Sequence, residues 1–357
     1  MTGRGIDQIL PHPGKPHIFE PYLRSAQGYV TLAEEAHGLI PRPVDPAYIW
    51  GDALAELERA GPQARIINLE TAVTAAEDVW PGKGINYRMH PENVSCLTAA
   101  RIDCCVLANN HVLDWGYAGL KETLATLREA GIHTAGAGAD EAEAAAPAIV
   151  ELDAGRRVLV FAFGHASAGV PPEWAARNDR PGVNYLADLS ALTANAISRH
   201  VAASRRASDV AVASIHWGGN WGYDIPAGHQ RFARQLLDAG AIDVVHGHSS
   251  HHPLGIEVYR NKLILYGCGD LLNDYEGISG HESYRPDLSL LYLPSLDPAS
   301  GELSSCALVP MRVRGFRLNR ASSEDAAWLQ RRLTREGGPF GTRVALEADG
   351  TLMLQWD

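Results

Sequence analysis

Cysteine is scarce in this sequence of 357 residues, and its five cysteines form no pair with C-x-x-C spacing. That spacing is typical of zinc and redox sites, so its absence argues against a metal site built from thiolates. Cys104 and Cys105 are adjacent within an apolar run, and the number of thiols is odd. These features predict a reduced protein with buried thiols.

Strongly basic segments and long apolar runs are also missing. The net charge is −11, and the pair Arg331 and Arg332 lies in a helical pattern that is typical of a solvated surface. Nucleic acids need clustered Lys and Arg for their phosphates, so we expect no nucleic-acid partner. No stretch reaches the roughly 18 apolar residues of a membrane span, and the first residues lack the apolar core of a signal peptide. We therefore expect a cytoplasmic protein without membrane contact.

The remaining composition, with 46% hydrophobic and 20% charged residues, is that of a globular protein. Short apolar runs alternate with helical patterns, which indicates an α/β fold with a largely buried sheet and helices packed on it. We expect the strands near residues 65–67, 103–108, 134, 157–163, 209–215, 242–245 and 263–266. We expect the helices over residues 53–60, 117–130, 192–204 and 227–239.

The pattern changes beyond residue 288, where strands become the main element. They are expected over residues 288–293, 303–313 and 343–356, with a helix over 324–335. We therefore predict a single domain, 1–357, in which a core of about 1–290 is completed to an α/β sandwich by residues 291–357. Two long polar loops, 72–90 and 164–186, are of the kind that covers a functional site.

Polar motifs follow five of the predicted strands. They are NLE at 68–70, NNH at 109–111 with Asp114 beyond, HWGG at 216–219, HGHSSHH at 246–252 and GD at 269–270. Ligands of open α/β sheets bind outside the carboxyl ends of the strands, so these side chains are expected to converge on one rim. Imidazole, carboxylate and amide groups are nitrogen and oxygen ligands, which suit Ca, Mn, Fe or Zn.

Each motif also has a structural explanation. An Asn-His pair after a strand is about as often a turn as a site, and Glu70 alone could simply begin a loop. His246 is more simply explained as a core histidine at the end of a strand. Trp217 is equally compatible with a core position and with a wall of the site. Asp274 fits a solvated loop. The case for a site depends on the five motifs occurring together.

These motifs resemble those of the CapA-like proteins, the poly-γ-glutamate capsule synthesis type. The resemblance is carried by NLE at 68–70, ANNHVLDWG at 108–116, HWG at 216–218, GHSSH at 247–251 and GIEVY with LILYGCGD at 255–270. It covers about residues 1–290 and implies a calcineurin-like metallophosphatase-type α/β sandwich with a metal site at the strand ends. The residues that match the family's polar positions are Glu70, Asn110, His111, His216, His248, His251 and Asp270.

The sequence departs from the family in two places. The family opens with a strand that ends in Gly-Asp just before a segment like MTGRGIDQI, and that carboxylate is missing here; Asp7 is not an obvious equivalent. Either the true N-terminus lies upstream of Met1, or one ligand has been lost. The metallophosphatase pattern Gly-His-x-His also appears as Gly-His-Ser-Ser-His, which argues against a standard two-metal centre.

The chain as a whole resembles the CapA-like epimerases of lasso-peptide biosynthesis. This resemblance implies a metal-dependent isomerase that inverts the Cα of a C-terminal residue, tryptophan, of a ribosomal precursor peptide, which would be its partner. Proton transfer would need a base on one face and an acid on the other, with a metal stabilising the enolate-like intermediate. We assign proton transfer to His111 with His248 or His251, supported by Asp114 and Asp270.

The remaining assignments concern the metal and the substrate. A divalent ion, Ca or Mn first and Zn or Fe second, is expected on Glu70, Asn110, His216 and His248. Arg88, Trp217 and Asn220 are predicted to bind substrate. Two alternatives stay open, a metal-dependent phosphoesterase and an accessory protein of capsule-polymer (poly-γ-glutamate) biosynthesis.

Overall fold

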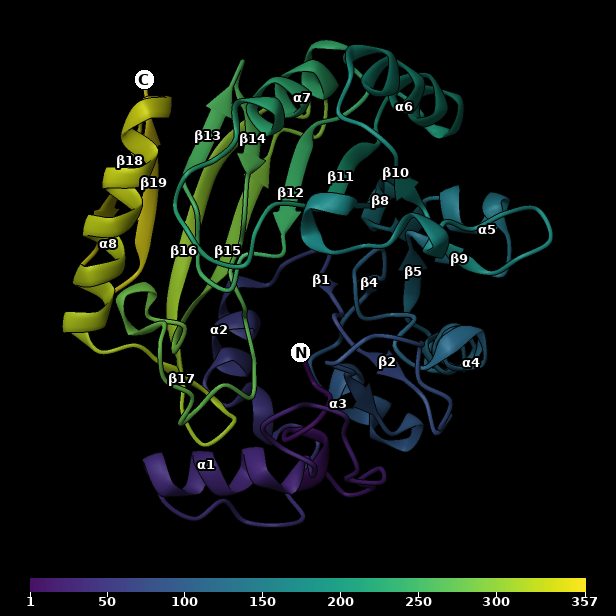
Figure 1. Ribbon diagram of the computed structural model, residues 1–357. Coiled ribbons are helices and arrows are strands. Elements are labelled where there is room, and N and C mark those ends of the chain that lie inside the picture. Colours follow the sequence, from purple (N-terminus) through teal and green to yellow (C-terminus); the bar gives the residue numbers. More distant parts are fainter.

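The computed structural model describes residues 1–357 and contains two main β-sheets that face each other (Figure 1). The larger sheet has the strand order β10-β8-β11-β12-β14-β13, with β7 added beside β8. Its central strands β8, β11, β12 and β14 are parallel, whereas β7 and β13 are antiparallel to their neighbours. Its strands are β7 (Ala148–Glu151), β8 (Arg157–His165), β10 (Tyr185–Leu186), β11 (Val210–His216), β12 (Val244–His248), β13 (Ile256–Tyr259) and β14 (Lys262–Leu265).

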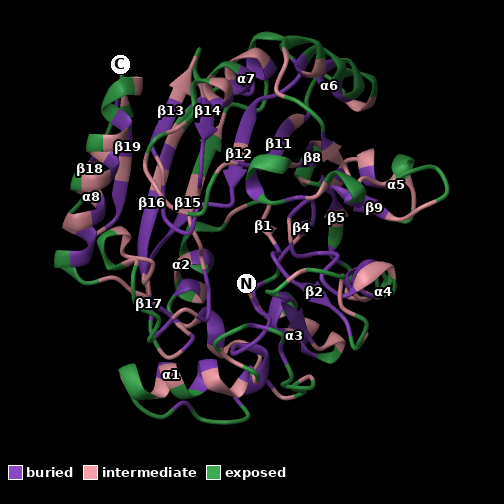
Figure 2. Cartoon of the chain, viewed as in Figure 1, coloured by how far each residue is buried: buried purple, intermediate pink, exposed green.

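Side chains along each strand of this sheet point alternately to its two faces, and a different set of elements packs on each face. Leu159 and Phe161 of β8 point into a core shared with α6 (Ala191–Ser204) and α7 (Ala227–Asp238). Val158 and Val160 point the other way, into a core shared with the C-terminal strands. Because successive strand side chains face opposite sides, one apolar run serves both cores. Figure 2 shows these central strands as buried and the outer helix surfaces as exposed.

The C-terminal segment forms the second sheet, as expected from the change in pattern. Its strand order is β15-β16-β19-β18, with β17 paired to β16, and every pairing is antiparallel. Its elements are β15 (Leu288–Leu296), β16 (Leu303–Val313), β17 (Leu318–Arg320), α8 (Ser323–Gly337), β18 (Thr342–Leu346) and β19 (Leu352–Trp356). Leu290, Leu308 and Leu352 join the core beneath the larger sheet, so the predicted α/β sandwich is confirmed.

A third group of strands carries the first two polar motifs. β1 (Ile66–Asn68), β4 (Cys104–Val106) and β5 (His133–Ala135) form a parallel sheet. Helix α4 (Gly116–Glu129) follows β4, and α2 (Ala53–Ala60) precedes β1. The N-terminal elements share their own core of 40 buried residues with this sheet. They include α1 (Gln27–His37), α3 (Ser95–Ala99) and the pair β2 (Ala72–Val73) and β3 (Arg88–Met89).

A cavity of about 550 Å³ lies between the free edges of β1 and β15. β1 pairs only with β4, and β15 pairs only with β16, so each strand presents one unpaired edge. The cavity wall is mainly apolar and includes Ile66, Val212 and Leu293. Its inner end reaches Glu70 and Asp270, so the cavity is continuous with the polar residues at the strand ends.

Several local expectations are corrected or confirmed by the structure. The strand expected at 242–245 begins at Val244 and continues through His248. Gly247 is required inside it, because a Cβ there would lie 2.3 Å from the carbonyl oxygen of Tyr266. All five cysteines are free, and four of them are buried, as predicted. Burial raises the pKa of the Cys96 thiol to about 12, which keeps it unreactive. None of the helices combines the length and the apolar character that a membrane crossing requires.

Candidate metal and acid–base site

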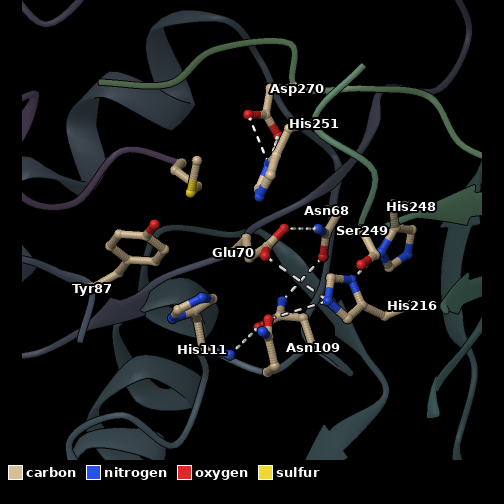
Figure 3. A network of polar contacts seen from close by, with 12 residues as sticks. Asn68, Glu70, Tyr87, Asn109, His111, His216, His248, Ser249, His251 and Asp270 are labelled. Atoms are coloured by element: carbon tan, nitrogen blue, oxygen red, sulfur yellow. Dashed lines mark hydrogen bonds and ion pairs between the residues drawn. The ribbon is translucent and has the colours of Figure 1, made fainter. Parts of the chain in front are cut away.

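The carboxyl ends of β1, β4, β11 and β12 meet at one rim, as the motif positions predicted (Figure 3). The register of the parallel pairs explains the convergence, because Asn68 lies opposite Val106 and His216 lies opposite His248. Residues that leave these strands together must project into the same space. The cavity between β1 and β15 borders that space, because Glu70, His248 and Asp270 are among its lining residues.

Three donor atoms form what we call the cage: Glu70 Oε1, Asn110 Oδ1 and His216 Nε2. The imidazole nitrogen lies 3.1 Å from the Asn110 oxygen and 3.9 Å from the Glu70 oxygen. Asn68 donates its amide to Glu70 Oε2 at 3.0 Å, and Asn109 in turn donates to Asn68 at 3.0 Å. The two asparagines therefore fix the orientation of the carboxylate.

The cage fits one divalent cation. Two donors bound about 2.1 Å from one ion, at angles of roughly 90–110°, lie about 3.0–3.4 Å apart. The 3.1 Å separation of His216 and Asn110 falls in this range, whereas the 3.9 Å separation of His216 and Glu70 is longer and would have to shorten around an ion. No three His, Cys, Asp or Glu side chains are grouped to hold an ion by themselves, because the third donor is the amide of Asn110. Burial lowers the pKa of His216 well below its ordinary value, so its ring is neutral, as a ligand must be.

His111 lies on one side of the cage and is held by a carboxylate. Its Nδ1 lies 2.7 Å from Asp114 Oδ2, and its ring packs on Tyr87 with centroids 4.0 Å apart. The ammonium of Lys83 contacts Asp114, the backbone oxygen of Asn110 and, at 3.1 Å, Nδ1 of His111 itself. Burial, together with the Lys83 charge, lowers the pKa of His111 to about 4. The ring nitrogen Nε2 has no protein partner and is free for proton transfer.

His251 lies on the other side of Glu70 and is held in the same way (Figure 3). Its Nδ1 is 3.1 Å from both oxygens of Asp270, which also accepts from Asn273 at 3.0 Å. Burial alone would lower the pKa of His251, but the Asp270 carboxylate outweighs burial and raises it. The two imidazoles therefore differ in the same site, with His111 biased to the neutral form and His251 to the charged form.

Glu70 is the most perturbed carboxyl group of the rim. Burial raises its pKa to about 7, and the nearby Asp270 carboxylate adds to the rise while His251 opposes it. A buried carboxyl beside a second carboxylate is costly to ionise unless a positive charge compensates it. This environment is favourable for a bound cation.

His248 does not lie where the sequence predicted. Its Nδ1 is 2.8 Å from Nδ1 of His216, and its Nε2 is 2.9 Å from the hydroxyl of Ser214. Both ring nitrogens are therefore engaged behind His216, because β12 extends to residue 248 and pairs it with His216. His248 supports a cage residue rather than completing the cage.

Of the three residues predicted to bind substrate, two lie away from the cage and one lies next to His251. The guanidinium of Arg88 donates to the backbone oxygens of Ala76 and Lys15 and stacks on Trp115, with no contact to the cage. Trp217 is a core residue, because it is buried and its indole donates to Tyr266. Neither is placed to contact a substrate in the cage. Asn220 remains a candidate, since it is exposed and its backbone oxygen accepts from the His251 amide at 3.0 Å.

Several residues that support the site were not predicted to belong to it. Asn68 and Asn109 lie inside recognised motifs, so their spacing was the available signal. Lys83 and Tyr87 come from the predicted covering loop 72–90, whose Trp80 contacts Trp174 of the other long loop at 5.4 Å. A loop residue has no periodicity that ties it to a distant strand end.

Asp7 does not point into the cage. It accepts from the backbone amides of Gly14 and His90 and from the side chain of Asn93, all within 2.8 Å. These bonds tie the N-terminal segment to the segment around His90.

Comparison with known proteins decides the family. The model of the family described as "Bacterial capsule synthesis protein PGA_cap" matches residues 1–275. The chain belongs to the PGA_cap family. The match ends shortly before β15, and it includes every residue of the cage and both imidazole–carboxylate pairs.

Relatives of this PGA_cap protein are named for polymer and capsule synthesis. A probable polyglutamine synthesis accessory protein of Mycobacterium tuberculosis is 52% identical over 353 residues, which is 99% of this chain and 93% of the relative. The PGA biosynthesis protein CapA of Bacillus subtilis is 28% identical over 208 residues, 58% of this chain and 52% of the relative. The capsule biosynthesis protein CapA of Bacillus anthracis is 28% identical over 193 residues, 54% and 45% of the two chains.

A solved structure, described as a novel phosphatase from Mycoplasma pneumoniae, is also similar to this PGA_cap protein. It covers 76% of this chain and 84% of its own, with 10% identity and a TM-score of 0.39. A likeness at that level gives no information about the reaction.

Proposed function

We propose that this protein is a metal-dependent enzyme that hydrolyses amide bonds of a glutamine- or glutamate-based polymer during its synthesis. The observation that carries the substrate class is the 52% identity, across 99% of this chain, with the probable polyglutamine synthesis accessory protein of Mycobacterium tuberculosis. The observation that supports an enzyme is the rim itself, where buried ionisable groups surround the cage.

Two imidazoles on opposite sides of Glu70 supply the proton transfers (Figure 3). Each is oriented at Nδ1 by a carboxylate and has Nε2 free. Burial and the Lys83 ammonium keep His111 neutral at rest, so its Nε2 has a lone pair that can accept a proton from water, and the Asp114 carboxylate stabilises the imidazolium that forms. His251 lies beside Asp270, which favours the imidazolium, so it donates a proton to the leaving nitrogen as the carbon–nitrogen bond breaks.

A cation in the cage would polarise the scissile carbonyl and make water a stronger acid. Glu70, Asn110 and His216 would hold it. The chain's acidic character favours a neutral glutamine polymer over polyglutamate, because the net charge is −11 and polyanions are repelled by a surface of that sign.

Epimerisation at the Cα of a peptide residue is the second candidate. It is favoured by one observation, the placement of two carboxylate-held imidazoles on opposite sides of the cage (Figure 3). The lasso-precursor substrate with a C-terminal tryptophan belongs to this candidate, but none of the relatives described above is named for it. Hydrolysis is preferred because water is a far stronger acid than the Cα–H of an amide-linked residue, so an imidazole base removes its proton more readily.

One assay separates the two reactions. The purified protein is incubated with Mn²⁺ and a short glutamine oligomer, once in ¹⁸O-labelled water and once in deuterium oxide, followed by mass and chiral analysis. Hydrolysis predicts shortened oligomers with one ¹⁸O per new carboxyl end, and EDTA should stop it. Removal of the base in His111→Gln should lower the rate roughly 10²–10⁴-fold.

The other outcomes decide against this function. Deuterium at Cα with formation of D-residues, at constant length, would replace hydrolysis by epimerisation; the same readout applied to a peptide ending in tryptophan tests the lasso substrate. If the oligomers stay intact and unlabelled while a generic phosphodiester is cleaved, the protein is a phosphoesterase instead.

A further inference from the structure

A continuous line of hydrogen bonds leads from the cage into the sheet. His216 Nδ1 is 2.8 Å from His248 Nδ1, and His248 Nε2 is 2.9 Å from the hydroxyl of Ser214. The same hydroxyl is 2.9 Å from Nδ1 of His246. We call these four residues, His216, His248, Ser214 and His246, the relay. None of its distances exceeds a normal hydrogen bond.

The strand register creates the relay. β11 and β12 are parallel neighbours in which Ser214 lies opposite His246, and His216 lies opposite His248. Residues two apart on a strand share a face, so all four side chains stand on the same face of the sheet. His246 also lines the cavity, which connects the far end of the relay with the space between the two sheets. The hydrogen-bond partners of His246 and His248 are Ser214 and His216, and no carboxylate pairs with either ring, which supports neutral rings.

If the three imidazoles are neutral, all hydrogen bonds of the relay must run from donor to acceptor in the same direction. Each neutral imidazole has one donor nitrogen and one acceptor nitrogen, so the proton position on one ring fixes it on the next. When the cage holds only oxygen acceptors, His216 Nε2–H donates to Asn110. Then Nδ1 of His216 accepts from His248, whose Nε2 accepts from Ser214, whose oxygen accepts from His246.

A cation in the cage requires the opposite direction, because His216 Nε2 must then offer a lone pair. Each relay proton moves along its own hydrogen bond toward the cage. One proton leaves His216 Nε2, one proton enters at Nε2 of His246 from the cavity, and every group stays neutral. The protons therefore balance, and Ser214 is the central position because its hydroxyl gives one proton to His248 as it receives one from His246.

We propose that Ser214, His246 and His248 are positioning residues that set the tautomer of His216 and reverse it when the cage takes up a cation. The proposal rests on the cation site above, but its first half concerns the metal-free protein. It gives His246, which resembles a plain core histidine in the sequence, a defined task. Outer partners that orient a ligand histidine typically change metal affinity by about 10–100-fold.

The test is ¹⁵N NMR of the histidine side chains, which distinguishes Nδ1–H from Nε2–H, in metal-free protein and after addition of Zn²⁺. The wild type should show His216 as Nε2–H without metal and as Nδ1–H with Zn²⁺, and His248 should change from Nδ1–H to Nε2–H at the same time. In Ser214→Ala the metal-free rings should become tautomer mixtures, with Zn²⁺ affinity reduced about 10–100-fold. Ser214→Thr restores a hydroxyl and should restore both.

Ser289→Ala is the matched control, because Ser289 is a buried strand serine whose hydroxyl has no partner. It should leave the spectra and the affinity unchanged. Identical His216 and His248 tautomers in Ser214→Ala and wild type would overturn the relay, and normal Zn²⁺ binding there would leave the proposed function standing. Absence of Zn²⁺ binding by the wild type would instead remove the cation site, while the metal-free spectra still decide whether Ser214 sets the tautomers.

Discussion

Glu70→Gln is expected to lower the affinity for Mn²⁺ by more than about 100-fold and to abolish turnover of the glutamine oligomer. Glu70 is the only charged donor of the cage, and its side chain is buried, so the substitution removes the negative charge that compensates the cation. Loss of a ligand should exceed the roughly 10–100-fold effect of losing an outer partner. Isothermal titration of metal-free protein with Mn²⁺ measures the change.

Glu257→Gln is the control for this substitution. Glu257 is equally buried but pairs with Arg234 and Tyr266, and it has no contact with the cage. Its variant should bind Mn²⁺ as the wild type does. Unchanged Mn²⁺ affinity in Glu70→Gln would show that the cation binds elsewhere or not at all.

Asp274→Ala is expected to destabilise the protein by about 3–5 kcal/mol, because it removes one of the two buried carboxylates that compensate the Arg4 charge and leaves only Glu20. Both groups are almost fully buried, and Asp274 accepts from the Arg4 guanidinium at 2.5 and 3.1 Å. The guanidinium also lies 4.4 Å from the ring centre of Tyr87, the residue that packs on His111. The substitution should therefore loosen the site as well as the fold. Urea unfolding measures the free energy of unfolding.

Asp287→Ala removes a carboxylate from a more exposed ion pair with Arg285 and provides the comparison. Its cost should be at most about 1 kcal/mol, the range of surface pairs. A loss below about 1 kcal/mol for Asp274→Ala would contradict the view that this buried pair stabilises the N-terminal segment beneath the site.

Much of the fold follows from apolar patterning. The strand expected at 303–313 and the helix expected at 53–60 have the predicted bounds. The change to a strand-rich C-terminal segment was also visible, although the antiparallel pairing of its strands was not predicted. β7 (Ala148–Glu151) and β13 (Ile256–Tyr259) were not expected as strands, since short strands at a sheet edge depend on their partners rather than on their own pattern.

The sequence predicted which residues gather at the site, but it did not predict the position of each one within it. Strand-end positions placed Glu70, Asn110 and His216 on one rim, and the structure brings them together. The place of His248 could not be derived, because it depends on whether β12 ends before or after Gly247. A strand that continues through Gly247 pairs His248 with His216, whereas a loop would have freed it for the cage.

The burial of Asp274 was also not predictable from the sequence. Its sequence context, with several polar neighbours, is typical of a solvated loop. The structure buries it against Arg4, which is 270 residues away in the chain. A local sequence pattern cannot predict an ion pair between residues that are so far apart in the chain.

We propose above that cleavage of the glutamine oligomer requires one cation bound in the cage. The most direct measurement strips the protein with EDTA, adds back Mn²⁺ in steps, and determines bound metal per chain and glutamine-oligomer cleavage in the same samples. We predict that one bound Mn²⁺ per chain restores activity in proportion to occupancy, and that Glu70→Gln neither binds nor cleaves. Cleavage by the stripped protein, or stoichiometric binding that Glu70→Gln leaves intact, would contradict the account.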